Sequence, residues 1–289
     1  MSWMNTGYNK GTVVKKRRLG HNKPIICGRK KKTMQQNITI PDDGISLSAV
    51  LETPEGAGEA KKLPLVIILH GFGSAKNRIH TLQTAEAMQD AGFATLRLDL
   101  FGHGESGGEF RRHTLYKWID NTLTVIGYMR SLGYTDLYLS GHSQGGLVAA
   151  LAAGMAPDRI RGLFLRAPAF LIPEGARTGS LLGYTFEPDR IPESIPLPQG
   201  VTLDGDYIRV AQAVHAEDAA DRFKGPVLIL QGAEDDVVPP ETVRPFAARY
   251  ADCELAEIEG EGHHFDKRPE EMTERIRTFM EKLRERRNA

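Results

Sequence analysis

Residues 136–155 read Asp-Leu-Tyr-Leu-Ser-Gly-His-Ser-Gln-Gly-Gly-Leu-Val-Ala-Ala-Leu-Ala-Ala-Gly-Met, and this stretch decides the fold. Residues 136–140 predict a strand, and residues 144–155 predict a helix whose small side chains suit close packing against a sheet. Ser143 lies in the tight turn between them, inside a G-x-S-x-G pattern. A serine in such a turn has strained backbone angles, and Gly141 and Gly145 avoid the clashes that side chains would cause there. The stretch therefore predicts a serine hydroxyl held above the end of a strand.

Strands and helices alternate on both sides of this stretch. Residues 65–69, Leu-Val-Ile-Ile-Leu, are apolar without alternation, which indicates a strand covered on both faces. Two earlier β-branched segments joined by Pro41-Asp42-Asp43-Gly44 predict a hairpin. The pattern predicts strands over 37–40, 45–51, 65–69, 93–100, 136–140, 162–167, 226–231 and 253–258, and helices over 79–91, 114–132, 144–155, 241–250 and 269–286. This order predicts an α/β fold with a mostly parallel central sheet and helices on both faces.

The alternation stops between residues 168 and 224. Six prolines fall within about thirty residues of this segment, mixed with glycines and aromatic residues, so long regular elements cannot form. Loops of this length inside a compact domain are usually functional. We therefore expect one domain over residues 34–289, with an inserted lid over about 168–224 that covers a site.

The net charge of zero hides two unlike parts of the chain. The 289 residues hold 37 Lys and Arg and 37 Asp and Glu, but ten of the bases and none of the acids lie in residues 1–33, which leaves the remainder at −10. Because like charges repel and no periodicity is present, residues 1–33 predict a disordered basic extension. We interpret it as an addition upstream of a natural start at Met34. The alternative is a segment that binds nucleic acid or an anionic surface.

Composition also excludes several classes of protein. No apolar run approaches the roughly 18 residues that a membrane span requires. The two cysteines, Cys27 and Cys253, are too few for a disulfide scaffold, and we recognise no signal peptide. We therefore expect a cytoplasmic protein with no membrane or nucleic-acid partner. The oligomeric state, a homodimer included, stays open.

A serine nucleophile needs a base, and the base needs a carboxylate that holds it in one tautomer. Carboxylates follow the strand predicted at 226–231, and histidines follow the strand predicted at 253–258. Asp235 is favoured over its acidic neighbours because the turn G-x-x-D-x-x-V-P directs its fourth residue inward. His263 is favoured over His264 because it follows the glycine of G-x-G-H-x-F. Since the carboxyl ends of parallel strands share one edge, Ser143, Asp235 and His263 are predicted to form a catalytic triad.

An oxyanion formed beside Ser143 needs two donors. The backbone amide of Gln144, at the start of the helix, is the first candidate. The second should come from the loop His70-Gly71-Phe72-Gly73 after the first central strand, and we predict the Phe72 amide. The His70 side chain is predicted to order this loop by hydrogen bonding.

Other histidines and glycines predict no cofactor. The histidines lack the H-x-x-x-H or Cys-His spacing of a metal site, so no metal is expected. Gly71-x-Gly73 lacks the third glycine and downstream acid of a dinucleotide site, and no phosphate-binding G-x-x-x-x-G-K-[ST] pattern occurs. Asp99, at the start of a glycine-rich turn, is predicted to accept hydrogen bonds from backbone amides.

Five motifs in order resemble the α/β-hydrolase superfamily over residues 35–286. They are His-Gly-Phe-Gly (70–73), Asp-x-x-Gly-His-Gly-Glu-Ser-Gly-Gly (99–108), Gly-His-Ser-Gln-Gly-Gly (141–146), Gly-Ala-Glu-Asp-Asp-Val-Val-Pro (232–239) and Gly-x-Gly-His-His-Phe (260–265). Within the superfamily, the chain is most similar to bacterial feruloyl (cinnamoyl) esterases. That similarity rests on Arg-Ala-Pro-Ala (166–169), the compact insertion and Gly-Asp-Tyr-Ile-Arg (205–209).

This resemblance implies a serine esterase that releases hydroxycinnamic acids from plant-derived esters through an acyl-enzyme. It implies a small-molecule ester substrate, no cofactor and a lid whose polar groups bind the phenolic ring, with Tyr207 and Glu174 as candidates. A general carboxylesterase, a monoacylglycerol lipase or an acyl-thioesterase would use the same triad and stays an alternative. The mixture of aromatic and acidic residues in the insertion argues against a long acyl tail, which would need a more uniformly apolar channel.

Overall fold

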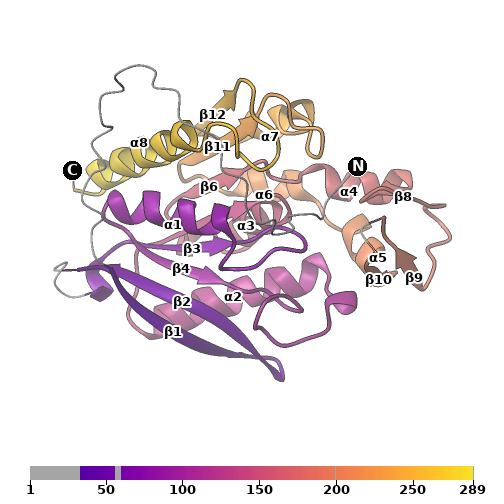
Figure 1. Ribbon diagram of the computed structural model, residues 1–289, viewed down its shortest axis with the longest axis horizontal. Coiled ribbons are helices and arrows are strands. Elements are labelled where there is room, and N and C mark those ends of the chain that lie inside the picture. The colour runs from indigo at the N-terminus through magenta and orange to yellow at the C-terminus, as the bar shows by residue number, and fades with distance from the viewer. Residues whose placement is uncertain (1–32, 56–59, 199, 289) are drawn as a thin grey trace, which may run out of the picture. The chain divides into compact units, whose positions relative to one another are not determined.

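The computed structural model describes residues 33–55, 60–198 and 200–288 (Figure 1). The predicted basic extension, residues 1–33, lies outside these residues except for Thr33, which opens the first strand. None of the described helices is long and apolar enough to cross a membrane.

An eight-stranded sheet forms the centre of the fold. Its order is β1-β2-β4-β3-β5-β6-β11-β12, and every neighbouring pair from β4 to β12 is parallel. The strands are β1 (Thr33–Asp42), β2 (Ile45–Pro54), β3 (Leu65–Leu69), β4 (Ala94–Leu98), β5 (Leu137–His142), β6 (Leu163–Arg166), β11 (Val227–Gly232) and β12 (Cys253–Ile258). The predicted α/β fold with a mostly parallel sheet is confirmed.

The antiparallel hairpin β1–β2 is longer than the sequence predicted. Asp42 pairs with Ile45, so the turn is only Asp43-Gly44, and both residues have positive φ (25° and 75°). Such a two-residue turn matches the twist of a hairpin. Pro41 lies inside the strand and not in the turn, and a proline is tolerated there because β1 is an edge strand.

Helices cover both faces of the sheet and enclose two cores. α1 (Ile79–Asp90) and α8 (Pro269–Asn288) pack on one face, together in Figure 1, whereas α2 (Leu115–Ser131), α3 (Gln144–Met155) and α6 (Ala216–Arg222) pack on the other. All five residues of β3 are buried, with Val66 and Ile68 in one core and Leu65, Ile67 and Leu69 in the other. This two-sided burial explains the unbroken apolar run.

One predicted helix, over residues 241–250, is largely wrong. The chain forms a 3₁₀ turn (Pro240–Thr242) and a single helical turn, α7 (Arg244–Ala247). Pro245 is the physical reason. It has no N–H to donate to the preceding turn, and its ring restricts Arg244, so a helix can begin near Pro245 but cannot run through it.

Residues 168–224 contain only short elements, as predicted. They are α4 (Leu171–Thr178), the pair β7 (Ser180–Leu181) and β8 (Tyr184–Thr185), the pair β9 (Ser194–Pro196) and β10 (Thr202–Asp204), α5 (Asp206–Gln212) and α6. In Figure 1, α4, α5 and β8 to β10 lie together at one end of the described structure. α6 instead packs tightly against α3, where a Cβ on Gly154 would lie 2.5 Å from Ala219 Cα. The end of the segment therefore belongs to the helical layer. Three further 3₁₀ turns occur at Ala60–Lys62, Phe110–Arg112 and Pro157–Arg159.

Candidate active site

Three side chains meet at the carboxyl edge of the sheet. Ser143 follows β5, Asp235 follows β11 and His263 follows β12. The Ser143 Oγ lies 3.0 Å from His263 Nε2, and His263 Nδ1 lies 2.8 Å from Asp235 Oδ2. Residues separated by 120 and 28 positions in the sequence thus form one hydrogen-bonded chain. The structure brings together the three residues that the sequence predicted.

The turn around Ser143 is strained and closely packed. Ser143 has φ 56° and ψ −124°, a conformation that a residue with a side chain rarely adopts. A Cβ on Gly141 would lie 2.2 Å from the Gly145 carbonyl oxygen, and a Cβ on Gly145 would lie 2.3 Å from that of His70. Any side chain at either glycine would therefore push the serine turn out of place.

Asp235 is held by donors on several sides. Its Oδ1 accepts from the amides of Val237 (2.9 Å) and Val238 (2.8 Å), and its Oδ2 accepts from Gln231 Nε2 (3.1 Å) as well as from His263. Burial opposes ionisation of this carboxyl, but the hydrogen bonds from His263, Val238 and Val237 outweigh burial and lower its pKa. Asp235 is therefore a carboxylate at neutral pH.

The residues next to Asp235 and His263 in the sequence make other contacts or lie in solvent. Glu234 is exposed and pairs with Lys267 (3.0 Å), and Asp236 is also exposed. His264 stacks on His80 of α1, with ring centroids 5.7 Å apart. Of each set of neighbours, only the predicted residue takes part in the hydrogen-bonded chain.

The loop after β3 lies directly against the serine. A Cβ on Gly71 would lie 3.1 Å from Ser143 Cβ, so a larger residue would crowd this contact. Within the described residues, neither the Phe72 amide nor the Gln144 amide donates a hydrogen bond. Both predicted oxyanion donors are thus available to a ligand.

His70 orders this loop. Its Nδ1 donates to the Gly71 carbonyl oxygen (2.8 Å), and its Nε2 accepts from the Leu100 amide (3.1 Å), which fixes the tautomer. Burial, with a smaller contribution from His103, lowers the pKa of His70 to about 4. His70 is therefore a neutral structural residue, as the sequence predicted.

Asp99 accepts from the amides of Lys76 (2.6 Å) and Glu105 (2.9 Å), in line with its predicted role. It also forms a buried ion pair with the Lys76 ammonium group. No sequence pattern indicates this role for Lys76, because a lysine in a polar loop usually lies in solvent. This ion pair joins the loop after β3 to the glycine-rich turn after β4.

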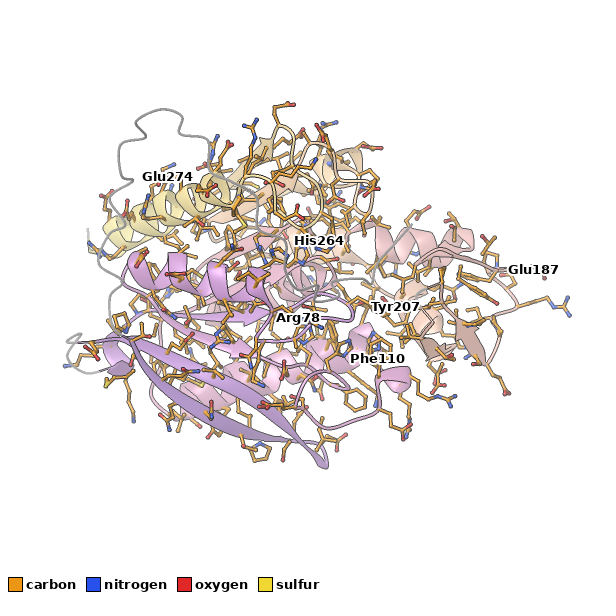
Figure 2. The ribbon with its side chains drawn as sticks, in the orientation of Figure 1. Arg78, Phe110, Glu187, Tyr207, His264 and Glu274 are labelled. Atoms are coloured by element: carbon orange, nitrogen blue, oxygen red, sulfur yellow. The ribbon has the colours of Figure 1, made fainter. Side chains whose placement is uncertain are left out.

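Tyr207 of α5 lies over the site. Its hydroxyl donates to Gln144 Oε1 (2.7 Å), its ring centroid lies 6.5 Å from that of Phe72 and 5.2 Å from that of His113, and it is 1% exposed. Burial raises its pKa, so the hydroxyl stays protonated. Figure 2 labels Tyr207 and also Phe110, whose ring packs against Phe72 with centroids 5.4 Å apart.

Glu174, the second candidate for substrate binding, is not brought to the triad. Its side chain on α4 is 69% exposed and lies 3.6 Å from the Arg177 guanidinium. A residue that the sequence did not place at the site, His113, instead contacts both Phe72 and Tyr207. Only its tertiary contacts reveal this position.

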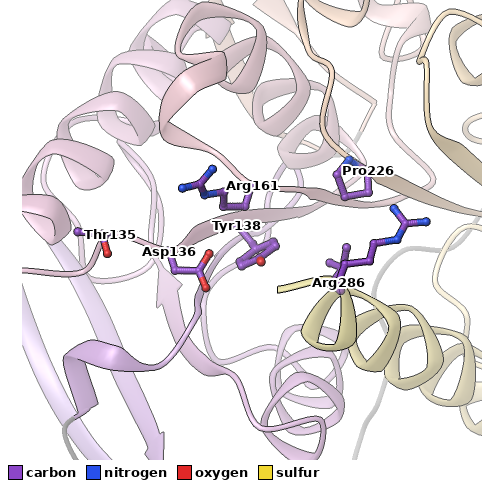
Figure 3. A pocket seen from close by; sticks show the side chains of 7 residues that line it. Thr135, Asp136, Tyr138, Arg161, Pro226 and Arg286 are labelled. Atoms are coloured by element: carbon purple, nitrogen blue, oxygen red, sulfur yellow. The ribbon is translucent and has the colours of Figure 1, made fainter. Parts of the chain in front are cut away.

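A cavity of about 490 Å³ lies away from these residues (Figure 3). It lies near the amino ends of β5, β6 and β11, on the edge of the sheet opposite to Ser143. Its lining includes Thr135, Asp136, Tyr138, Arg161, Pro226 and Arg286. In open α/β sheets, ligands bind at the carboxyl ends of the strands, so this cavity is not part of the candidate site. Within the described residues, no three His, Cys, Asp or Glu side chains are grouped to hold a metal ion.

Comparisons with known proteins agree with the fold. Residues 60–191 match the family model described as serine aminopeptidase, S33. A solved structure of Est1E from Butyrivibrio proteoclasticus with bound ferulic acid has 43% sequence identity and a TM-score of 0.82, over 85% of this chain and 98% of that chain. The mouse α/β hydrolase domain-containing protein 10 has 19% identity and a TM-score of 0.69, over 86% and 99% of the two chains, a likeness of fold alone.

Curated relatives match over shorter parts. The palmitoyl-protein thioesterase ABHD10 of Bos taurus is 27% identical over 207 residues, which are 67% of this chain and 64% of that protein. The acetyltransferase component of an acetoin cleaving system from Pseudomonas putida is 37% identical over 108 residues, 37% of this chain and 27% of that protein. The chain thus spans less than two thirds of the length of these two relatives.

Proposed function

Because the chain belongs to the α/β-hydrolase superfamily, we propose that it is a serine carboxylic ester hydrolase acting on esters of hydroxycinnamic acids such as ferulate. The hydrogen-bonded chain from Ser143 through His263 to Asp235 is the observation that carries the hydrolase chemistry. The similarity to Est1E, whose solved structure holds ferulic acid, supports the substrate class.

Acylation of Ser143 is the first half of the proposed mechanism. His263 Nε2 takes the hydroxyl proton while Ser143 Oγ attacks the ester carbonyl carbon. Asp235, ionised and hydrogen-bonded to Nδ1, stabilises the imidazolium that forms. The amides of Phe72 and Gln144 donate to the oxyanion, and His263 then gives the proton to the departing alcohol.

Hydrolysis of the acyl-enzyme is the second half. A water molecule takes the place of the alcohol, and His263 removes its proton as the water attacks the acyl carbon. The same two amides donate to the oxyanion of the tetrahedral intermediate. When this intermediate collapses, His263 returns the proton to Ser143 Oγ. Carboxylic acid then leaves.

The segment 168–224, apart from α6, is the proposed lid, and Tyr207 is the proposed contact for the substrate phenol. Because the Tyr207 hydroxyl proton is directed at Gln144 Oε1, the tyrosine oxygen keeps a lone pair that can accept a hydrogen bond. A phenolic hydroxyl can donate to it, whereas an unsubstituted cinnamoyl ring cannot. Glu174 has no place in this contact, because its side chain is exposed and paired.

An acyl-thioesterase is the second candidate. The similarity to the palmitoyl-protein thioesterase ABHD10 favours it over a general carboxylesterase or a monoacylglycerol lipase, which would use the same triad. The aromatic rings of Phe72, Phe110 and Tyr207 around the site favour a flat ring over a long acyl chain.

A panel of esters separates these candidates. Methyl ferulate, p-nitrophenyl butyrate, monoolein and an acyl-CoA are compared by kcat/KM, with Ser143→Ala as the control for enzyme-dependent turnover. We expect methyl ferulate to be preferred and Ser143→Ala to lose almost all activity while it stays folded. Preference for acyl-CoA would favour the thioesterase, and full activity in Ser143→Ala would overturn the serine mechanism.

Binding of nucleic acid or an anionic surface through the basic extension is a function of another class. Deletion of residues 1–32, which leaves β1 intact, should not change kcat/KM for methyl ferulate. A large fall would connect the extension to catalysis. The cytoplasmic location stays a prediction, which cell fractionation would test. The oligomeric state, a homodimer included, stays open, and sedimentation of the full chain would determine it.

A further inference from the structure

His142, the residue before Ser143, lies between two loops of the candidate site. Its Nε2 lies 2.8 Å from the backbone carbonyl oxygen of His263, and the two imidazole rings are 4.7 Å apart. On its other side, a Cβ on Gly71 would lie 3.4 Å from His142 Nδ1. The loop after β3, the serine turn and the loop after β12 therefore meet at this one imidazole.

The chemistry of the contact fixes the proton on His142. A carbonyl oxygen only accepts hydrogen bonds, so Nε2 must carry the proton and donate it. Burial, together with the nearby His263, Arg166 and His264, lowers the pKa of His142 well below its usual value, and the bond to the His263 carbonyl only partly opposes this. The His142 ring is therefore neutral near pH 7.

This hydrogen bond holds the catalytic histidine by its backbone. Within the described residues, the backbone of His263 makes no other hydrogen bond. Asp235 restrains the far side of the imidazole, but it does not fix the main chain from which the ring extends. Without a second restraint, the loop could shift while the contact between His263 and Asp235 is kept.

We propose that His142 is a positioning residue that fixes the His263 loop to the serine turn and so sets the distance between His263 Nε2 and Ser143 Oγ. The proposal rests on the serine mechanism proposed above, but not on the identity of the ester. Because His142 and Ser143 are consecutive, any movement of the serine turn carries the histidine loop with it. A proton transfer that depends on a 3.0 Å contact would be preserved by this connection.

The test compares three substitutions of one residue. His142→Leu removes the donor, His142→Gln places an amide N–H where Nε2 stood, and His142→Asn carries an amide that is too short to reach the carbonyl. His215→Gln is the matched control, because His215 is an exposed histidine at the start of α6. The rate at which a fluorophosphonate labels Ser143 reports nucleophile activation with no assumption about the ester. The NMR signal of the His263 Nδ1 proton reports its hydrogen bond to Asp235.

We expect His142→Leu and His142→Asn to label about 10- to 100-fold more slowly than the wild type, with His142→Gln within about threefold of it. For p-nitrophenyl butyrate, kcat should fall and KM should stay nearly constant. The His263 proton signal should shift or broaden in the Leu and Asn variants and stay in place in the Gln variant. If His142→Leu does not fold, the comparison between Gln and Asn decides.

Equal labelling rates in His142→Gln and His142→Asn, or an unchanged rate and proton signal in His142→Leu, would overturn the proposal. Failure of the wild type to be labelled would overturn it together with the serine mechanism. A wild type that is labelled but does not hydrolyse methyl ferulate would overturn only the proposed substrate and leave the role of His142 to be decided by the variants.

Discussion

The Tyr207 hydroxyl donates a 2.7 Å hydrogen bond to the side chain of Gln144, the residue that follows Ser143. The proposed lid is thus joined to a residue whose backbone amide is a proposed oxyanion donor. Both partners are almost fully buried, so the bond is shielded from water. A contact that stabilises the fold therefore also restrains the residue that carries this proposed donor.

Substitution of Tyr207 by Phe should separate the two roles of this hydroxyl. The buried side-chain oxygen of Gln144, Oε1, loses the hydroxyl that donates to it, so the free energy of unfolding should fall by about 1–3 kcal/mol. Turnover of methyl cinnamate should fall modestly, and kcat/KM for methyl ferulate should fall further, because only the ferulate can donate to the tyrosine oxygen. Ester kinetics and urea unfolding measure the two effects, with Tyr184→Phe as the control on the same segment. Equal losses for the two esters would reject the phenol contact.

Asp235→Asn should impair catalysis without disturbing the neighbouring turn. An asparagine amide can donate to His263 Nδ1, which would leave the imidazole proton on Nε2. A protonated Nε2 in the neutral ring cannot accept the proton of Ser143. We expect kcat for p-nitrophenyl butyrate to fall by about 10³- to 10⁴-fold. Asp236→Asn, an exposed change one position away, should retain full activity. A large loss in Asp236→Asn with activity kept in Asp235→Asn would show that the carboxylate of the triad is Asp236.

The pKa of Asp235 also predicts a dependence of stability on pH. Its folded-state pKa lies below that of an ordinary aspartate, so the carboxylate stabilises the fold above pH 4. This contribution is lost as the pH falls through the folded-state pKa. Asp235→Asn should therefore show less acid destabilisation below pH 4 than the wild type in urea unfolding.

Much of the site could be predicted because its residues follow strands. Once β5, β11 and β12 are recognised as parallel, Ser143, Asp235 and His263 must share the carboxyl edge of the sheet. The broken helix at residues 241–250 could have been predicted too, since Pro245 forbids an uninterrupted helix.

The remaining contacts join residues without a shared pattern. Tyr207 and Gln144 are 63 positions apart, and the bond from His142 to the His263 carbonyl spans 121. Lys76 lies in a polar loop, and only the fold shows that it is buried against Asp99. Such contacts depend on how loops pack over the sheet, which neither periodicity nor a local motif encodes.

His113 predicts a second dependence of stability on pH. Burial lowers its pKa to about 3, below the value of about 6.5 expected when it is unfolded. Between these values the unfolded chain binds a proton that the folded chain does not, so stability falls as the pH falls, by up to about 1.4 kcal/mol per pH unit. His113→Phe removes this proton. The variant loses the hydrogen bond to the Phe110 carbonyl, so its free energy of unfolding should be lower than that of the wild type at pH 7. This difference in the free energy of unfolding should become smaller as the pH falls from 7 to 4.5.

Urea unfolding at several pH values measures how steeply the free energy of unfolding depends on pH in each protein. His215→Phe, at an exposed position, should leave the slope of the wild type unchanged. If the free energy of unfolding depends equally steeply on pH in His113→Phe and in the wild type, the folded protein also binds a proton at His113, and the prediction is wrong. His70 and His103 titrate in both proteins and therefore cancel in the comparison.

Arg166 lies in the interior without a carboxylate partner among the described residues. It is 2% exposed, its Nη1 contacts the Met272 sulfur at 3.3 Å, and its Nε has no hydrogen-bond partner in the same part of the chain. Burial removes the water that would solvate the charged form and lowers the pKa of Arg166 to about 10. Replacement of a buried charge by an apolar side chain of similar length is often neutral or stabilising by about 1–4 kcal/mol. We therefore expect Arg166→Met to raise the free energy of unfolding at pH 7.

The matched control is Arg161→Met, a change of the same kind at an exposed arginine before β6, which should alter stability by less than about 0.5 kcal/mol. Urea unfolding of the wild type and the two variants at pH 7 tests both statements. A loss of stability at pH 7 in Arg166→Met larger than that in Arg161→Met would show that the guanidinium stabilises the loop around Phe265, over whose ring it lies at 6.0 Å.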